Sequence, residues 1–220
     1  MSEFPIVFHL QGRLCVIVGG GPVGIRKARA LCRAGARVRL IAPPAGRPEL
    51  AAVEVIDRPY RQGDLAGAFL AFAATDDRQV NDAVAAEARA AGIPVNVADA
   101  PEEGDFSLPA QLRRGALTVA VSTGGRSPDL AALVRDRLAG VLGPEWAIVL
   151  EIAAALRQKK LTHSPEAEYN PGILRQLVEG DLPSLIAAGS TGRIDRLLET
   201  LAGKDCSLAA LGVRLRKEET

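Results

Sequence analysis

The chain has little cysteine, little histidine and almost no net charge, and each shortage excludes a class of protein. The three cysteines among its 220 residues, Cys15, Cys32 and Cys206, form no C-x-x-C pair and no cluster with histidine. Neither a disulfide framework nor a zinc site is therefore indicated. The two histidines, His9 and His163, are isolated, and we expect no metal site. With a formal net charge of +1, nucleic acid and an anionic membrane are not the expected partners.

Long hydrophobic runs are also missing. No apolar stretch approaches the length of a membrane-spanning helix, and the N-terminal residues MSEFPIVFHLQGR lack a basic segment followed by a long apolar one. The sequence shows no internal repeat and no low-complexity segment. We expect a cytoplasmic protein that consists of one large domain, or of one medium domain with an appendage.

The most informative stretch is RLCVIVGGGPVG, residues 13–24. It begins with an apolar run without polar alternation, as expected of a central parallel strand covered on both faces. Gly19, Gly21 and Gly24 follow at G-x-G-x-x-G spacing, and the next residues predict a helix over 22–34. Strand, glycine turn and helix thus have the order of a dinucleotide site, with the pyrophosphate at the helix N-terminus.

The helix over residues 22–34 is predicted to be amphipathic. Its expected buried side chains are Val23, Ala28, Leu31 and Cys32, and its basic residues, expected to point mainly outward, are Arg26, Lys27, Arg29 and Arg33. A strand over residues 37–42 follows. A dinucleotide site often has an acidic residue about 20 residues past the glycines. Here the strand ends in Ala42, Pro43 and Pro44, so the side chains do not select between NAD and NADP.

Further strands are predicted over residues 53–56, 68–74 and 93–98. A helix between the last two is expected to be capped by Thr75 or Asp76 and to bury Val80, Ala83, Val84 and Ala88. Strands that alternate with helical patterns predict an α/β fold, a parallel Rossmann-type sheet up to about residue 100.

Ligands of such sheets lie beyond the carboxyl ends of the strands. The glycine turn, the pair Thr75 and Asp76, and residues 96–101 should therefore face one crevice. Within the last segment, Asp99 is a carboxylate at the exit of a buried strand, close to where a nicotinamide would lie. It is either a catalytic group or a turn residue before Ala-Pro, and the pattern alone does not separate the two.

The second half of the chain does not continue the alternation of strands and helices. A β-type run over residues 116–122 suggests pairing elsewhere, for example across a dimer interface. The following TGGRSP loop leads into a helix with Ser127 at the N-cap and Pro128 in the first turn. The loop either binds an anion through backbone amides and Arg126 or simply starts the helix. The helices predicted after it cover residues 145–160, 171–179, 182–188, 193–202 and 208–216.

We therefore predict three parts: a nucleotide-binding domain over residues 1–112, a small β/α dimerisation segment over 113–143, and a helical domain over 144–220.

Four stretches are similar, in order, to the precorrin-2 dehydrogenase family, the NAD-dependent module of siroheme synthesis. They are FPIVFHLQGRLCVIVGGGPVGIRKARALCRAGARV, AATDDRQVNDAV, NVADAPEEGDFSLPA and LTVAVSTGGRSPDLAALVRDRL, and they cover most of residues 4–140. The resemblance implies a free-standing form, because no methyltransferase domain fits in this chain, and we also expect a homodimer. It also implies that precorrin-2 loses a hydride to NAD⁺ and a proton, giving sirohydrochlorin, and some members also insert Fe²⁺.

The resemblance assigns roles to single residues. Asp99 matches the family's catalytic carboxylate, and the cofactor contacts carried over are Pro22, Val23, Pro43 and Pro44. Thr123 stands where the family often has a serine, which leaves any phosphorylation there open. Because the substrate carries many carboxylates, Arg113, Arg114 and Arg126 become candidate substrate-binding residues together with Asn96 and Thr123. Two alternatives stay open: a bifunctional dehydrogenase and ferrochelatase, and, more remotely, a non-catalytic NAD-sensing module.

Overall fold

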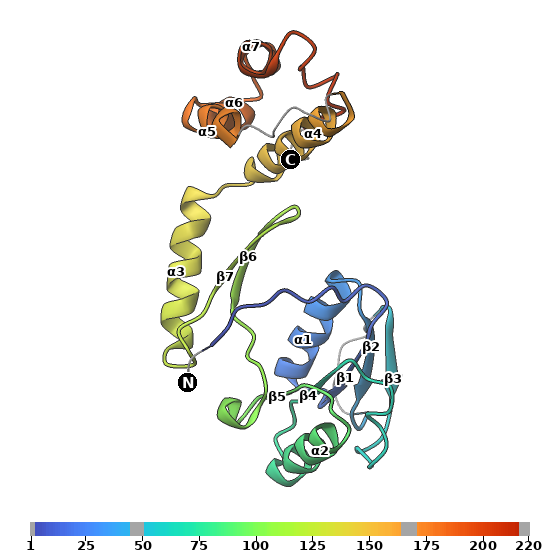
Figure 1. Ribbon diagram of the computed structural model, residues 1–220. Coiled ribbons are helices and arrows are strands. Elements are labelled where there is room, and N and C mark those ends of the chain that lie inside the picture. Colours follow the sequence, from blue (N-terminus) through green and yellow to red (C-terminus); the bar gives the residue numbers. More distant parts are fainter. Residues whose placement is uncertain (1–2, 45–50, 164–170, 216–220) are drawn as a thin grey trace. The chain divides into compact units, whose positions relative to one another are not determined.

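The computed structural model describes residues 3–44, 51–163 and 171–215. The chain divides into two compact units, Met1–Leu108 and Pro109–Thr220 (Figure 1). Each unit encloses hydrophobic clusters made only of its own residues. The division into three parts at residues 112 and 143 stays a prediction.

Within the described residues, the first unit contains a five-stranded parallel sheet in the order β3-β2-β1-β4-β5, flanked by helices. Its elements, in chain order, are β1 (Leu14–Val18), α1 (Pro22–Arg33), β2 (Arg37–Ile41), β3 (Val53–Ile56), β4 (Leu70–Ala73), α2 (Arg78–Ala90), β5 (Val95–Val97) and the 3-10 turn η1 (Pro101–Glu103). The predicted α/β Rossmann-type fold is confirmed. Because all these strands are parallel, their carboxyl ends lie along one edge.

Strand β1 is covered on both faces, as its unbroken apolar sequence predicts. Successive side chains of a strand point to opposite faces. Val16 and Val18 lie in the cluster that contains the buried side chains of α2, whereas Cys15 and Ile17 lie in the cluster that contains those of α1. The sheet is therefore wound on both sides, and β1 stands at its centre.

The start of α2 differs from the prediction. Its N-cap is Asp77, whose Oδ1 accepts hydrogen bonds from the backbone N–H groups of Gln79 and Val80, and not Thr75 or Asp76. A carboxylate at this position satisfies N–H groups that have no partner inside the helix.

The buried faces of both helices also differ in part from the prediction. On α2, Asn81 and Ala85 are buried, whereas Ala83, expected inside, is exposed. On α1, Ile25 is buried together with Ala28 and Leu31, whereas Val23 and Cys32, also expected inside, are only partly buried. Lys27, expected to point outward, is half-buried, because its long side chain lies along the sheet.

The apolar segment before β1 does not pair with the sheet. Residues 3–10 have no regular secondary structure, and Phe4 and Val7 are exposed. Phe8 instead packs edge-to-face against Phe69, with ring centroids 5.5 Å apart, and Leu10 joins the cluster on the α1 side. The segment therefore covers the α1 side of the sheet and does not extend the sheet edge.

The second unit begins with a β-hairpin that the sequence prediction only half identified. Strand β6 (Ala110–Arg114), which was not predicted, pairs antiparallel with β7 (Leu117–Val121) around Gly115. The run over residues 116–122 thus pairs outside the parallel sheet, as expected, with a partner in its own chain. Pairing across a dimer interface stays a prediction. Helix α3 (Pro128–Val141) packs against both strands, with Ser127 as its N-cap as predicted.

The remaining helices enclose the core of the second unit. They are α4 (Trp146–His163), α5 (Pro171–Glu179), α6 (Leu182–Ala187) and α7 (Thr191–Ala202). Residues 208–212 form turns that complete the core, not the predicted helix. In the described part of the chain, no single helix is long and apolar enough to cross a membrane. Taken together, α3 and residues 146–159 have the length and composition of a membrane span, but the two helices are bent by 70° relative to each other.

Candidate active site

The three glycines of the turn after β1 have different surroundings. Gly19 has a φ of +117°, and a Cβ on it would lie 2.8 Å from the backbone nitrogen of Thr75. A Cβ on Gly24 would lie 3.0 Å from the carbonyl carbon of Gly19, so helix and turn need this glycine to pack. At Gly21 nothing lies within 4 Å of such a Cβ. The protein itself therefore needs Gly19 and Gly24, whereas the absence of a side chain at Gly21 keeps open space in front of α1.

The N-terminus of α1 is suited to an anion. Its N-cap is Gly21, which offers no capping side chain, and its first turn contains Pro22 and no acidic residue. The free N–H groups and the positive end of the helix dipole favour negative charge there. Helix α2 is a useful contrast, because Asp77 already occupies its N-terminal N–H groups. The residues present at α1 thus fit the pyrophosphate of a dinucleotide.

The strand next to β1 ends beside this turn. Gly19 donates a backbone hydrogen bond to the carbonyl of Ile41, the last residue of β2. Pro43 and Pro44 follow and are exposed. Their positions agree with the predicted contact to a cofactor's ribose, which stays a prediction, and no carboxylate of this segment decides between NAD and NADP.

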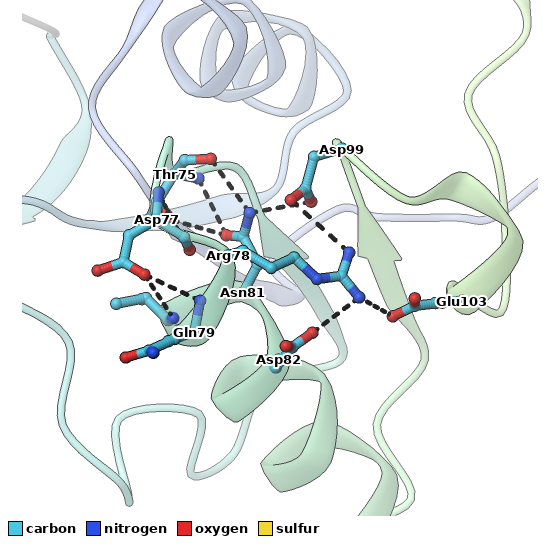
Figure 2. Close-up of polar contacts among 9 residues, drawn as sticks. Thr75, Asp77, Arg78, Gln79, Asn81, Asp82, Asp99 and Glu103 are labelled. Atoms are coloured by element: carbon cyan, nitrogen blue, oxygen red, sulfur yellow. Dashed lines mark hydrogen bonds and ion pairs between the residues drawn. The ribbon is translucent and has the colours of Figure 1, made fainter.

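On the other side of β1, a buried amide joins the exits of β4 and β5 (Figure 2). Asn81 is fully buried. Its Oδ1 accepts hydrogen bonds from the backbone nitrogen (3.1 Å) and the hydroxyl (2.8 Å) of Thr75. Its Nδ2 donates to the carbonyl of Thr75 at 3.1 Å and to Oδ1 of Asp99 at 2.9 Å. Thr75 and Asp99, two predicted site residues, thus both form hydrogen bonds with the side chain of Asn81.

Asp99 remains accessible in this arrangement. Its side chain is 38% exposed, and its second oxygen, Oδ2, lies 3.7 Å from a guanidinium nitrogen of Arg78. Arg78 also pairs with Asp82 at 2.9 Å and with Glu103 (Figure 2). The site therefore contains an accessible carboxylate, Asp99, which the side-chain amide of Asn81 orients. The guanidinium of Arg78 lies beside it and also pairs with two other carboxylates.

Sequence reasoning missed both Asn81 and Arg78. A usable signal was present, because an amide stands on a helix face that is otherwise apolar, four residues after the N-cap Asp77. Buried polar side chains of this kind are held by hydrogen bonds and often specify local geometry. Asp76, predicted to face the same crevice, is exposed in the loop that leads to α2.

Asn96 is used inside the fold. It is 5% exposed; its Nδ2 donates to the carbonyl of Phe106, and its Oδ1 accepts from Nζ of Lys27 at 2.7 Å. Burial, and to a lesser degree the nearby charge of Arg26, lowers the pKa of Lys27 to about 8. Lys27 Nζ also lies 5.5 Å from the ring centroid of Phe72. A role for Asn96 at the substrate stays a prediction, but both ends of its amide already have partners.

The candidate residues of the second unit lie in two places. Arg113 is exposed on β6, whereas the guanidinium of Arg114 donates to the carbonyls of Leu142 (2.8 Å) and Ala139 (3.3 Å) at the end of α3. Arg114 thus neutralises the negative end of a helix, which leaves Arg113 the more available of the two for a ligand.

The loop between β7 and α3 holds the other two candidates. The Thr123 hydroxyl donates to the Ser127 carbonyl and accepts from the Ser127 backbone nitrogen, and Arg126 is exposed. The substrate role of both residues stays a prediction. Among the residues that the structure describes, no group of three or more histidine, cysteine or acidic side chains is arranged to hold a metal ion.

Comparison with known proteins agrees with both units. Residues 6–110 match a family model described as NAD(P)-binding, and residues 114–140 match the family model "Sirohaem biosynthesis protein central". The siroheme synthase of Pseudomonas paraeruginosa is 38% identical over 209 residues, which cover 92% of this chain and 45% of the relative. The chain is therefore a homologue of siroheme synthases over nearly its whole length.

A second siroheme synthase matches in the same way. That of Nitrosomonas eutropha is 36% identical over 208 residues, with 91% of this chain and 44% of the relative covered. The chain thus spans just under half the length of these curated relatives. A solved structure entitled "SirC, precorrin-2 dehydrogenase" superimposes with a TM-score of 0.65 over 90% of this chain and 98% of that one. At 20% identity, this likeness confirms the fold.

Proposed function

We propose that the protein is an NAD⁺-dependent precorrin-2 dehydrogenase of siroheme biosynthesis, with Asp99 as the catalytic carboxylate. The observation that carries the proposal is the position of Asp99. It lies at the carboxyl edge of the sheet, is 38% exposed and is oriented by Asn81, in the same unit as an uncapped helix N-terminus suited to a dinucleotide. The similarity to siroheme synthases and the fold shared with a precorrin-2 dehydrogenase support the choice of substrate.

The residues of this chain divide the work. Gly21 and the N-terminus of α1 bind the pyrophosphate, and Pro43 and Pro44 pack against the ribose. The nicotinamide, when bound, supplies the hydride acceptor. Asp99 accepts the proton that precorrin-2 loses as the hydride leaves, so that one hydride and one proton are removed and sirohydrochlorin forms.

Anaerobic turnover tests this proposal. Precorrin-2 and NAD⁺ are mixed with the protein, and NADH absorbance and the sirohydrochlorin spectrum are followed, with NADP⁺ in a parallel reaction. We expect equal amounts of NADH and sirohydrochlorin. If no NADH forms with either cofactor, the proposed dehydrogenase activity is refuted. If NADP⁺ is the better acceptor, the choice of NAD⁺ is refuted alone.

A variant separates the enzyme from a module that only binds NAD. Asp99→Asn should keep cofactor binding and lose at least about 100-fold in kcat, which is the usual scale of a lost general base. The matched control is Glu54→Gln, which removes a carboxylate from the edge strand β3, where it pairs with Arg39. Near-normal turnover of Asp99→Asn would remove Asp99 from the reaction.

The second candidate activity is insertion of Fe²⁺ into sirohydrochlorin. The accessible carboxylate of Asp99 favours it, because such a group can hold iron briefly or accept a pyrrole proton. Adding Fe²⁺ after the first reaction tests this step. Siroheme must form faster with protein than without it, and an equal rate leaves the dehydrogenase activity only.

A homodimer is also part of the proposal. Helix α3 exposes apolar side chains that a second copy would cover, namely Leu130, Leu133, Val134 and Val141. Sedimentation equilibrium should give twice the mass of the chain, and a mass of one chain would refute this point.

A further inference from the structure

A fully buried amide, that of Asn81, contacts Asp99 and constrains its carboxylate. Asn81 lies on the face of α2 that otherwise buries Val84, Ala85 and Ala88. An amide in such a place lowers stability unless its hydrogen bonds are made. Here Oδ1 accepts two and Nδ2 donates two, so the hydrogen-bonding capacity of the side chain is filled.

The orientation of this amide is decided by its partners. The backbone nitrogen of Thr75 is a donor, so the atom facing it at 3.1 Å must be the amide oxygen. The carbonyl of Thr75 is an acceptor, so the atom facing it must be the amide nitrogen. A flipped amide would oppose donor to donor and acceptor to acceptor. It follows that Asn81 presents N–H to Asp99, and that Oδ1 of Asp99 accepts it.

The two oxygens of Asp99 are therefore unequal. Oδ1 accepts the hydrogen bond from Asn81 at 2.9 Å, and a proton placed on Oδ1 would compete with it. Oδ2 has Arg78 at 3.7 Å, which is too far for a hydrogen bond, and Arg78 shares its charge with Asp82 and Glu103. Of the two, Oδ2 is the oxygen that remains able to take a proton.

We propose that Asn81 is a positioning residue that fixes the Asp99 carboxylate and reserves Oδ2 for the proton taken from the substrate. The inference rests on the proposed function, which it deepens by assigning the reacting atom and its support. The O–H bond forms at Oδ2 as one bond from the substrate to hydrogen breaks, and the electron pair of that bond becomes part of the new double bond. A second bond, a C–H bond, breaks with its electron pair leaving as hydride to NAD⁺, which the proposed reaction supplies.

The same side chain connects Asp99 to the glycine turn. Asn81 holds both the backbone nitrogen and the carbonyl of Thr75, and the backbone of Thr75 packs directly against Gly19. Asn81 on α2 thus fixes the segment after β4 and the segment after β5 relative to each other. A loosened Asn81 should misplace the base relative to the cofactor, and displacements of about 1 Å can lower turnover on the order of 100-fold.

Asn81→Asp tests the positioning role without changing the size of the side chain. Two carboxylates in contact share a proton, so Asp99 would be ionised only at higher pH. We expect a lower kcat at neutral pH, an unchanged KM for NAD⁺, and an acid limb of the pH–kcat profile that moves up by about one pH unit or more. The matched control is Gln79→Glu, which adds a carboxylate on the exposed side of the same helix turn.

The outcomes of this experiment are decisive. A profile of Asn81→Asp that superimposes on those of wild type and Gln79→Glu would overturn the positioning role. The double variant Asn81→Asp, Asp99→Asn places a donor opposite the new carboxylate. The Tm of the double variant should be higher than that of Asn81→Asp, and the double variant should still lack turnover. A Tm below that of Asn81→Asp would argue against the contact between the two side chains.

A measurement on the wild-type protein avoids any folding defect of the variants. The side-chain amide signals of Asn81 in ¹⁵N–¹H spectra should titrate with the acid limb of the kcat profile, and this titration should be absent in Asp99→Asn. A flat response with normal turnover overturns the Asn81 inference alone. If wild type forms no NADH, the proposed function fails, and the catalytic meaning of the contact fails with it.

Discussion

Single residues of the glycine turn should separate folding from cofactor binding. Gly21 has ordinary backbone angles (φ −71°, ψ 178°), and a Cβ there meets no protein atom within 4 Å. Gly21→Ala should therefore keep the Tm of wild type, while the methyl group stands where the pyrophosphate must approach. We expect nicotinamide affinity to fall at least about tenfold, or roughly 1.4 kcal/mol, when measured by calorimetry.

Gly24→Ala is the contrasting change in the same turn. Its Cβ would overlap the backbone of Gly19, which cannot yield like a flexible side chain. The free energy of unfolding should drop by about 1–3 kcal/mol, as overpacking usually costs. A Gly21→Ala protein that melts as low as Gly24→Ala would contradict the assignment of the open space to a ligand.

The buried amine of Lys27 should make stability depend on pH. Its pKa is lowered from 10.5 to about 8 in the folded protein, mainly by burial, so above pH 8 the unfolded chain binds more protons. Stability must then rise with pH through this window. Between pH 7.5 and 9 the gain is about 1 kcal/mol by urea unfolding.

Lys27→Met is the control, because it keeps the length of the side chain and removes the titration. Its free energy of unfolding should show a flatter slope over the same pH window, and equal slopes would contradict the assignment. Cys15 acts in the opposite direction only at higher pH, since burial raises the pKa of its thiol to about 11 from a usual value of 9.

At the residue scale, the sequence identified what spacing and strand exits can reveal. The three glycines and Asp99 follow directly from the strand that precedes each of them. The roles of Asn81 and Lys27 do not follow from a local pattern, because their hydrogen-bond partners lie 18 and 69 residues away in the chain. Pattern reasoning places side chains on a face, but it does not pair them across elements.

At the scale of elements, the packing of α3 against β6 should depend on Arg114 and not on the neighbouring Arg113. Arg114 donates to carbonyls at the C-terminal end of α3, whereas Arg113 beside it is exposed. Arg114→Ala should lower the free energy of unfolding by about 1 kcal/mol, because it leaves helix carbonyls without a donor. Arg113→Ala should leave the Tm unchanged and, if Arg113 meets a substrate carboxylate, raise KM.

Denaturation and steady-state kinetics on the pair check this prediction. Equal losses of stability in both variants would show that Arg114 does not support α3.

The strand β6 itself shows where element prediction fails. Its sequence AQLRR carries a single buried apolar residue, Leu112, so neither hydrophobic alternation nor an apolar run marks it. It becomes a strand because β7 pairs with it across a tight turn at Gly115. The helices α1, α2 and α3 were predictable because each starts at a local signal, whereas the turns at residues 208–212 keep an apolar pattern without the length to form a helix.

At the scale of the whole molecule, the two units should respond differently to the cofactor. All the predicted nicotinamide contacts lie in Met1–Leu108, which packs around its own clusters, and the helices α4 to α7 enclose a separate one. A ligand that binds only the folded state stabilises the unit that holds it, by about 2.7 kcal/mol at 100 times Kd.

Hydrogen exchange followed by mass spectrometry can locate this effect. With saturating NAD⁺, amides of β1, β4 and the first turns of α1 should exchange more slowly, whereas those of α5 and α7 should be unchanged. Gly21→Ala supplies the control, since it should fold normally and lose the protection in α1. Equal protection of α7 would contradict independent units, because it would require the cofactor to stabilise a core that contains none of its predicted contacts.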